Sequence, residues 1–145
     1  MIAMGGEDQL AGGAVIDASV AVKWFVRAES TAESKAILRL VSEAQDRRFV
    51  VPELFYPELV SALKKSREGL AEVDVALEVV EQLPIESVPW HQSPKRMASR
   101  LALSNLSAYD ALYAAIAIER RLPLLTADLR LARALGTPAW VRTVA

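Results

Sequence analysis

The sequence contains no cysteine, so disulfide bonds, thiolate metal sites and cysteine nucleophiles are all excluded. It contains a single histidine, His91, which has no neighbouring nucleophile and is expected in a surface loop. Glycine-rich phosphate or dinucleotide loops are also missing, because Gly12 and Gly13 precede the first predicted strand, whereas such loops follow one. Catalysis by this chain would therefore depend on other side chains.

The chain also lacks a strong charge of either sign and any long apolar run. The net charge is −1, so a nucleic-acid partner would need a local basic surface. No apolar run reaches membrane-spanning length, and residues 1–13 contain no apolar signal segment. We therefore expect a soluble, cytoplasmic protein without a membrane partner, with a flexible leader over residues 1–13 and a single domain over residues 14–145.

Apolar residues make up 52% of the 145 residues, which is enough to fill the core of one domain. Short Val- and Ile-rich runs alternate with helical patterns, and the connections between them are short. This alternation favours a parallel α/β sheet with helices on both faces. Strands are predicted at residues 14–16, 49–51, 85–88, 123–126 and 140–141, and helices at residues 19–27, 31–48, 53–67, 70–83, 93–104, 107–121 and 129–135.

Three helix starts carry capping signals. The second helix is expected to begin at residue 30 or 31, with Glu33 completing a partial capping box. Ser93 before Pro94 predicts the start of another helix by the cap-then-proline rule. Ser107 precedes the most apolar helix, which should be largely buried.

Four acidic residues occupy equivalent places in this predicted sheet. Asp17 and Asp128 follow strands, whereas Glu58 and Asp110 lie near the starts of helices. Strand ends and the starts of the following helices share one edge of a parallel sheet, so the four side chains could converge there. Converging carboxylates repel one another unless they are protonated or bridged by a cation. Ligation by oxygen alone suits Mg²⁺ or Mn²⁺, which can orient a water for phosphoryl displacement.

Each acid also has a purely structural explanation. Asp128 could be a helix N-cap, Asp110 could complete a capping turn with Ser107, and Glu58 could be a solvated helix residue. Asp17 is the hardest to explain in this way, because an acid directly after a buried strand needs a partner. A non-catalytic binding module is therefore a second interpretation of the same residues.

Other polar and aromatic residues are ambiguous. Ser19 and Thr126 lie beside two of the acids and could bind a phosphate or a metal-bound water, or cap local backbone. Trp24 and Tyr109 are expected in the core, and not as platforms for base stacking. Two basic clusters could follow a phosphate backbone but are expected to be solvated helix faces. They are Lys64, Lys65 and Arg67, and Lys95, Arg96 and Arg100.

Four blocks of the sequence resemble PIN-domain ribonucleases and, within them, the VapC-type toxins of toxin–antitoxin pairs. The blocks are residues 15–25, 52–63, 107–117 and 125–131. The resemblance extends from about residue 14 to the C-terminus.

The resemblance implies a three-layer α/β/α fold with a small parallel sheet, and Mg²⁺- or Mn²⁺-dependent endoribonuclease activity. It implies that Asp17 and Asp110 bind the metal directly, while Glu58 and Asp128 complete the catalytic quartet through water or by orienting the nucleophile. The two hydroxyl residues beside the acids match accessory positions of the family. It further implies a homodimer, an RNA substrate and a cognate antitoxin that covers the site. A PIN-type RNA-processing nuclease without an antitoxin is the alternative.

Overall fold

The computed structural model describes residues 9–44, 46–66 and 69–145; most of the expected leader, and Arg67 of the first basic cluster, lie outside these ranges. Five strands form one parallel sheet in the spatial order β3-β2-β1-β4-β5. They are β1 (Gly13–Ile16), β2 (Arg48–Pro52), β3 (Ile85–Val88), β4 (Leu124–Thr126) and β5 (Val141–Thr143). The predicted parallel α/β architecture is confirmed.

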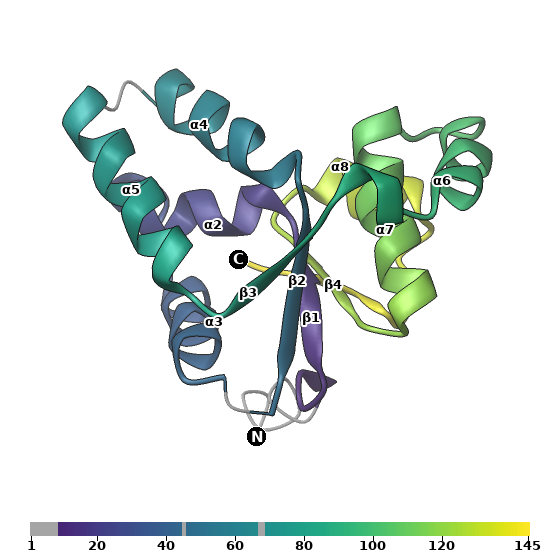
Figure 1. Ribbon diagram of the computed structural model, residues 1–145, viewed down its shortest axis with the longest axis horizontal. Coiled ribbons are helices and arrows are strands. Elements are labelled where there is room, and N and C mark those ends of the chain that lie inside the picture. The colour runs from purple at the N-terminus through teal and green to yellow at the C-terminus, as the bar shows by residue number, and fades with distance from the viewer. Residues whose placement is uncertain (1–8, 45, 67–68) are drawn as a thin grey trace.

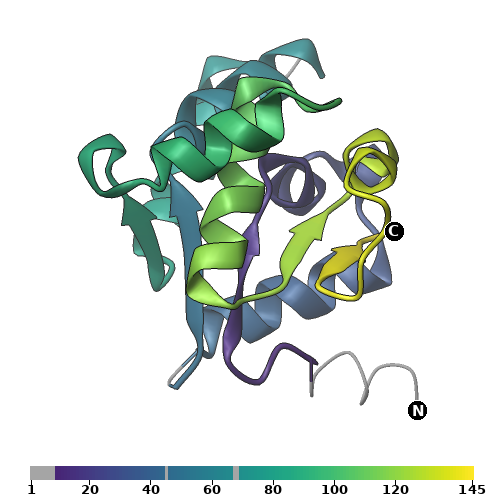
Figure 2. The same ribbon diagram turned by 90° about the vertical axis from the view of Figure 1, so that its right-hand side faces the viewer.

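Helices cover both faces of the sheet and make three layers. α6 and α7 lie on one face, and α2, α3, α4 and α5 lie on the other (Figure 1). Figure 2 shows α7 crossing the sheet in front of the central strands. The helices are α2 (Ala18–Phe25), α3 (Ala32–Ser42), α4 (Phe55–Lys65), α5 (Leu70–Gln82), α6 (Lys95–Ala102), α7 (Ala108–Arg120) and α8 (Leu129–Ala134), with 3₁₀ turns η1 (Arg27–Glu29) and η2 (Trp90–Gln92).

The core lies between the sheet and these helices. Every residue of β1 is buried, because β2 and β4 pair with it on both sides and helices cover both faces. Residues 111–117 of α7 are buried as well, which confirms the prediction for the most apolar helix. Across the described ranges, none of the helices combines the length and apolarity needed to cross a bilayer.

Local capping differs from the expectation at two helices. Thr31 is the N-cap of α3, and its capping box is closed by Ser34. The expected partner, Glu33, falls one residue short of the N3 position that a capping box requires, and it pairs with Arg142 instead. Ser93 does not cap α6, because its hydroxyl donates to the carbonyl of Pro89 at 3.1 Å.

Two other boundaries also shift. Arg48, expected at the end of a helix, is the first residue of β2, and Arg27 lies in η1 beyond the end of α2. Within the described part of the predicted leader, Leu10 is fully buried and Gly13 begins β1. The packed domain therefore includes residues on the N-terminal side of residue 14.

Gly13 is needed where β1 starts beside β2. Its φ is +104°, and a Cβ built on it would lie 1.9 Å from the carbonyl oxygen of Arg48. That carbonyl belongs to a paired strand and has little freedom to move. We therefore expect Gly13→Ala to lower the free energy of unfolding by more than about 1 kcal/mol, measured by urea denaturation.

Gly136→Ala is the matched control for this substitution. Gly136 also has a positive φ, of +80°, but no atom lies within 4 Å of its added Cβ. The Gly136→Ala variant has the backbone strain without the clash, so its loss in free energy of unfolding should be smaller than that of Gly13→Ala. An equal loss at the two positions would contradict the close approach of β1 and β2 as the reason for Gly13.

Candidate active site

The four predicted acids all lie at the carboxyl edge of the sheet. Asp17 follows β1, Asp128 follows β4 after one intervening residue, and Glu58 and Asp110 lie in the first turns of α4 and α7. Asp110 and Asp128 both raise the pKa of Asp17, and Asp17 raises that of Glu58, so the carboxylates lie within electrostatic range of one another. The structure thus brings together the four residues that the sequence analysis selected.

Asp17 is held at the centre of this cluster. Its side chain is buried, with the residue only 7% exposed, and its carboxylate Oδ2 accepts hydrogen bonds from Ser19 Oγ at 2.6 Å and Thr126 Oγ1 at 2.8 Å. Although Asp17 stands at the N-cap position of α2, its carboxylate makes no capping bond. Burial raises the pKa of Asp17, the two hydroxyls partly offset that effect, and Asp110 and Asp128 raise it further.

Ser19 and Thr126 connect Asp17 to the loop before α8. The Ala127 backbone N–H donates to Ser19 Oγ at 2.9 Å, and the Asp128 backbone N–H donates to Thr126 Oγ1 at 3.0 Å. Each hydroxyl therefore accepts from the loop while it donates to the same carboxylate oxygen. These bonds make Ser19 and Thr126 positioning residues for Asp17.

Glu58 is paired with a residue that the sequence analysis gave no role of its own. Tyr113 is fully buried, and its hydroxyl donates to Glu58 Oε1 at 2.7 Å. Burial raises the pKa of the half-buried Glu58, the Tyr113 bond partly offsets this, and Asp17 and Asp110 raise it again. The interpretation of Glu58 as a freely solvated helix residue is therefore wrong. The position of Tyr113 three residues after Asp110, on the same face of α7, was the available signal.

The carboxylate of Asp128 caps α8, as its structural explanation predicted, whereas Asp110 takes part in the cap of α7 only through its backbone N–H. Asp128 Oδ1 accepts from the backbone of Arg130 at 2.9 Å and of Leu131 at 3.2 Å. The Asp110 backbone N–H donates to Ser107 Oγ at 3.1 Å, so that bond does not involve the carboxylate. Burial raises the pKa of the Asp110 carboxyl, the nearby side chain of Ser107 lowers it, Asp128 raises it and Arg130 lowers it.

Arg130 is a cation shared by these two acids. Its Nη2 lies 3.6 Å from Asp110 Oδ2 and 3.5 Å from Asp128 Oδ2. The side chain of Arg130 is 78% exposed, so these contacts screen the carboxylates only weakly. The sequence contains Arg130 in one of the resembling blocks, but periodicity gave no reason to place it beside two acids.

The donor set fits a hard divalent cation that keeps much of its water. All four side chains offer carboxylate oxygens, which Mg²⁺ and Mn²⁺ prefer. Within residues 9–44, 46–66 and 69–145, no group of three or more His, Asp or Glu side chains is arranged to hold a metal ion by itself. Mg²⁺ commonly binds through only one or two carboxylates, with waters completing its shell. A pair of these acids therefore suffices.

The remaining candidate residues lie outside this cluster. His91 is exposed in η2, and its ring is 3.4 Å from Gln92 Nε2. Lys64 and Lys65 are exposed at the end of α4, as expected of a solvated face. Trp24 packs partly buried against the core, which agrees with the prediction.

The expectation for Tyr109 is wrong. Its residue is 66% exposed, although residues 111–117 of the same helix are buried. The first turn of α7 is not covered as its middle is, so an apolar pattern along the whole helix mispredicts this residue. Tyr109 thus becomes an exposed aromatic side chain directly before Asp110.

The sheet order and the carboxylate-lined edge define a small α/β/α domain with a candidate site for a divalent cation. This chain belongs to the PIN domain family, whose model matches residues 14–135. A comparison with curated proteins gave no match.

Solved structures share the fold at low sequence identity. A toxin–antitoxin complex from Klebsiella pneumoniae is similar at 18% identity and a TM-score of 0.65, covering 90% of this chain and 97% of that one. VapBC2 from Rickettsia felis, bound to a promoter DNA fragment, has 14% identity, a TM-score of 0.62 and coverage of 90% and 98%. VapC20 from Mycobacterium tuberculosis, a toxin that cleaves the sarcin–ricin loop, has 12% identity, a TM-score of 0.59 and coverage of 84% and 95%.

We expect Asp17→Asn to stabilise the metal-free protein at neutral pH, with a gain that shrinks as the pH falls. Folding raises the pKa of Asp17 above its ordinary 3.8, so the folded state binds that proton more tightly. The resulting stability is fully present below the unfolded pKa and is lost as the pH rises through the folded one. The amide that replaces the carboxyl does not titrate, and its oxygen can still accept hydrogen bonds from the Ser19 and Thr126 hydroxyls.

Thermal unfolding in a chelating buffer between pH 3 and 8 measures this difference. Asp74→Asn, at an exposed position on α5, makes the same chemical change outside the cluster. The pH dependence of the Asp17→Asn difference is judged against that of Asp74→Asn. A pH-independent difference for Asp17→Asn would show that folding does not perturb this carboxyl.

Proposed function

We propose that this protein is a metal-dependent endoribonuclease that hydrolyses RNA phosphodiester bonds with Mg²⁺ or Mn²⁺. The burial of Asp17 is the observation that carries the proposal. Asp17 is 7% exposed and repelled by Asp110 and Asp128, and its two hydroxyl bonds offset only part of that cost. A proton or a cation would supply the remaining stabilisation. Membership of the PIN domain family supports the same conclusion.

Asp17 and Asp110 would hold the ion directly, and Glu58 and Asp128 would act through water. The ion would supply positive charge to the scissile phosphate and an activated water. Glu58 has a raised pKa, which makes it a better proton acceptor than an ordinary carboxylate. The exposed guanidinium of Arg130 has the planar geometry that matches phosphate oxygens.

We also propose that the nuclease is the toxin of a toxin–antitoxin pair and is inhibited by a cognate antitoxin that covers the acidic edge. The support is the fold shared with the Klebsiella complex, with VapBC2 and with VapC20. A homodimer remains the expected assembly. The alternative, an RNA-processing nuclease without an antitoxin, would be favoured if no short open reading frame for an antitoxin adjoined the gene.

We expect Asp17→Asn and Asp110→Asn each to reduce RNA cleavage by at least about 100-fold, because each removes a charge that positions the reacting groups. The assay incubates total RNA with purified protein and Mn²⁺ and maps the products. Asp74→Asn should cleave like the wild type, because Asp74 is exposed on α5.

A thermal-shift titration with Mn²⁺ provides a readout that does not depend on cleavage. At about 100 times its Kd, an ion that binds only the folded state adds about 2.7 kcal/mol of stability. The wild type and Asp74→Asn should show this shift, and Asp17→Asn should lose most of it. Absence of a shift in the wild type, together with intact RNA, would favour the non-catalytic binding module.

We expect Tyr113→Phe to reduce the rate of RNA cleavage by about 10- to 100-fold, which is the usual cost of losing a group that orients a metal-site ligand. Its hydroxyl lowers the pKa of Glu58, so removing it should raise that pKa and shift the acidic limb of the pH–rate profile to higher pH. The profile is measured with a synthetic RNA at saturating Mn²⁺. A slower variant with an unshifted limb would indicate a role for Tyr113 in packing alone.

A further inference from the structure

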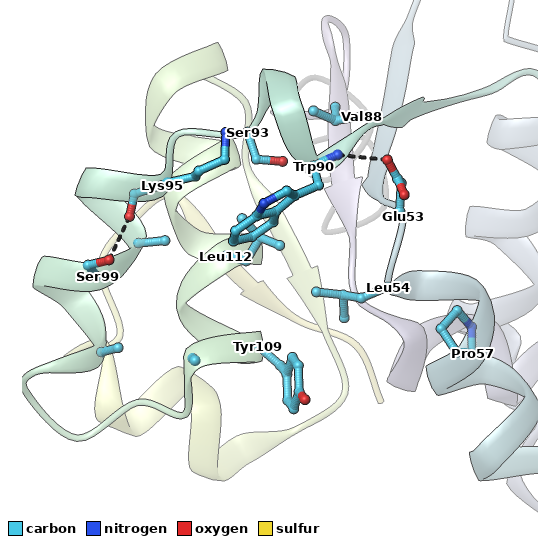
Figure 3. A pocket seen from close by; sticks show the side chains of 13 residues that line it. Glu53, Leu54, Pro57, Val88, Trp90, Ser93, Lys95, Ser99, Tyr109 and Leu112 are labelled. Carbon is cyan, nitrogen blue, oxygen red and sulfur yellow. Dashed lines mark hydrogen bonds between the residues drawn. The ribbon is translucent and has the colours of Figure 1, made fainter.

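A pocket of about 780 Å³ opens beside the acidic edge. It lies between the start of α4, the segment from β3 to α6, and the first turns of α7 (Figure 3). Leu54 and Leu112 belong to its apolar wall, and Trp90 and Tyr109 stand on two sides of it. The Trp90 residue is 59% exposed, so both aromatic rings are available to a ligand.

A second pocket lies next to this one and reaches one of the proposed catalytic groups. It has a volume of about 390 Å³ and shares Leu54, Pro57 and Tyr109 with the first. Its lining also includes Glu58, one of the four acids, and Lys65 near the end of α4. The two pockets are therefore neighbours, with Leu54, Pro57 and Tyr109 between them and Glu58 in the wall of the smaller one.

Trp90 is held in a defined position. Its backbone N–H donates to Glu53 Oε1 at 2.6 Å (Figure 3). Ser93 Oγ donates to the Pro89 carbonyl across the same turn. Lys95 Nζ lies 5.3 Å from the centre of the Trp90 ring, within the range of a cation–π contact. An aromatic surface held in this way loses little conformational freedom when a flat ligand binds.

We propose that the larger pocket binds an unpaired nucleobase of the RNA, next to the phosphate that is cut. This inference rests on the proposed function and specifies how the substrate is held. Unpaired bases are bound by stacking on exposed aromatic rings, and Trp90 and Tyr109 supply two of them. Lys65 and Lys95 line the two pockets and supply positive charge for the neighbouring phosphates.

A second copy of this chain is the main competing occupant, because exposed aromatic residues around an apolar surface also mark subunit interfaces. The link to Glu58 and the two lysines favour the nucleobase. A protein partner would not require a pocket that neighbours the acidic edge. Tyr109 directly precedes Asp110, so a base stacked on its ring would lie close to the metal-binding edge.

The test compares the loss of a base with the loss of an aromatic ring. Synthetic single-stranded RNAs contain one mapped cleavage site, and an abasic ribose replaces one nucleotide at a time on either side of it. The wild type should lose about 5- to 150-fold in kcat/KM at one flanking position, the range expected for base–aromatic stacking. On intact RNA, Trp90→Ala and Tyr109→Ala should each lower kcat/KM by a similar factor. On the RNA that lacks this base, kcat/KM of the two variants should equal that of the wild type.

Conservative variants and a surface control complete the design. Trp90→Phe and Tyr109→Phe keep an aromatic ring and should retain most of the activity and the sensitivity to the missing base. Val75→Ala removes an apolar side chain of comparable exposure, 58%, from α5, and should behave like the wild type. If removing the ring and the base together lowers kcat/KM by the product of the two separate factors, the proposal is overturned.

Oligomeric state provides the second readout. If Trp90→Ala turns a dimer into a monomer and slows all RNAs equally, the pocket is a subunit interface and the proposal fails. If the wild type cuts no RNA, the proposed function fails, and fluorescence anisotropy with a labelled single-stranded oligoribonucleotide still tests the pocket. Weaker binding by Trp90→Ala and Tyr109→Ala would then support it, and unchanged binding would overturn it.

Discussion

The burial of one negative charge organises the carboxyl edge of this protein. One oxygen of the Asp17 carboxylate accepts hydrogen bonds from two hydroxyl groups. Both hydroxyls also accept hydrogen bonds from backbone N–H groups between β4 and α8. Residues more than 100 positions apart in the chain thus meet around one carboxylate. The hydroxyls offset only part of the desolvation cost, and the other acids add to it. The same arrangement that makes the metal-free edge unfavourable makes it attractive to a cation.

The parallel sheet explains why the acids converge. β1 lies in the middle of the sheet with its carboxyl end beside those of β2 and β4, so each following segment starts at the same edge. α4 delivers Glu58 and α7 delivers Asp110 from opposite faces of the sheet (Figure 1). The acids therefore come from four separate segments, and none depends on a long loop for its place. Such positions are suited to groups that must be held with precision.

The sequence predicted the parts of the structure that follow from local patterns. Val- and Ile-rich runs located the strands, and the topology of a parallel sheet located the four acids. Contacts between distant segments could not be predicted in this way, such as the bond between Tyr113 and Glu58, which are 55 residues apart. The close approach of Arg48 to Gly13 and the exposure of Tyr109 depend on how neighbouring elements end. A helical pattern shows which face is apolar but not how far the neighbouring layer extends over it.

α7 carries Tyr109, Asp110 and Tyr113 on the first two turns of one rigid element. The opposite wall of the larger pocket, with Trp90, belongs to η2, which contributes none of the four acids. The two walls can therefore change independently of each other. Insertions or substitutions around η2 could alter the shape of the pocket while the distances between the carboxylates stay the same. Proteins built on this plan could in that way differ in the ligands that fit the pocket and keep one arrangement of acids.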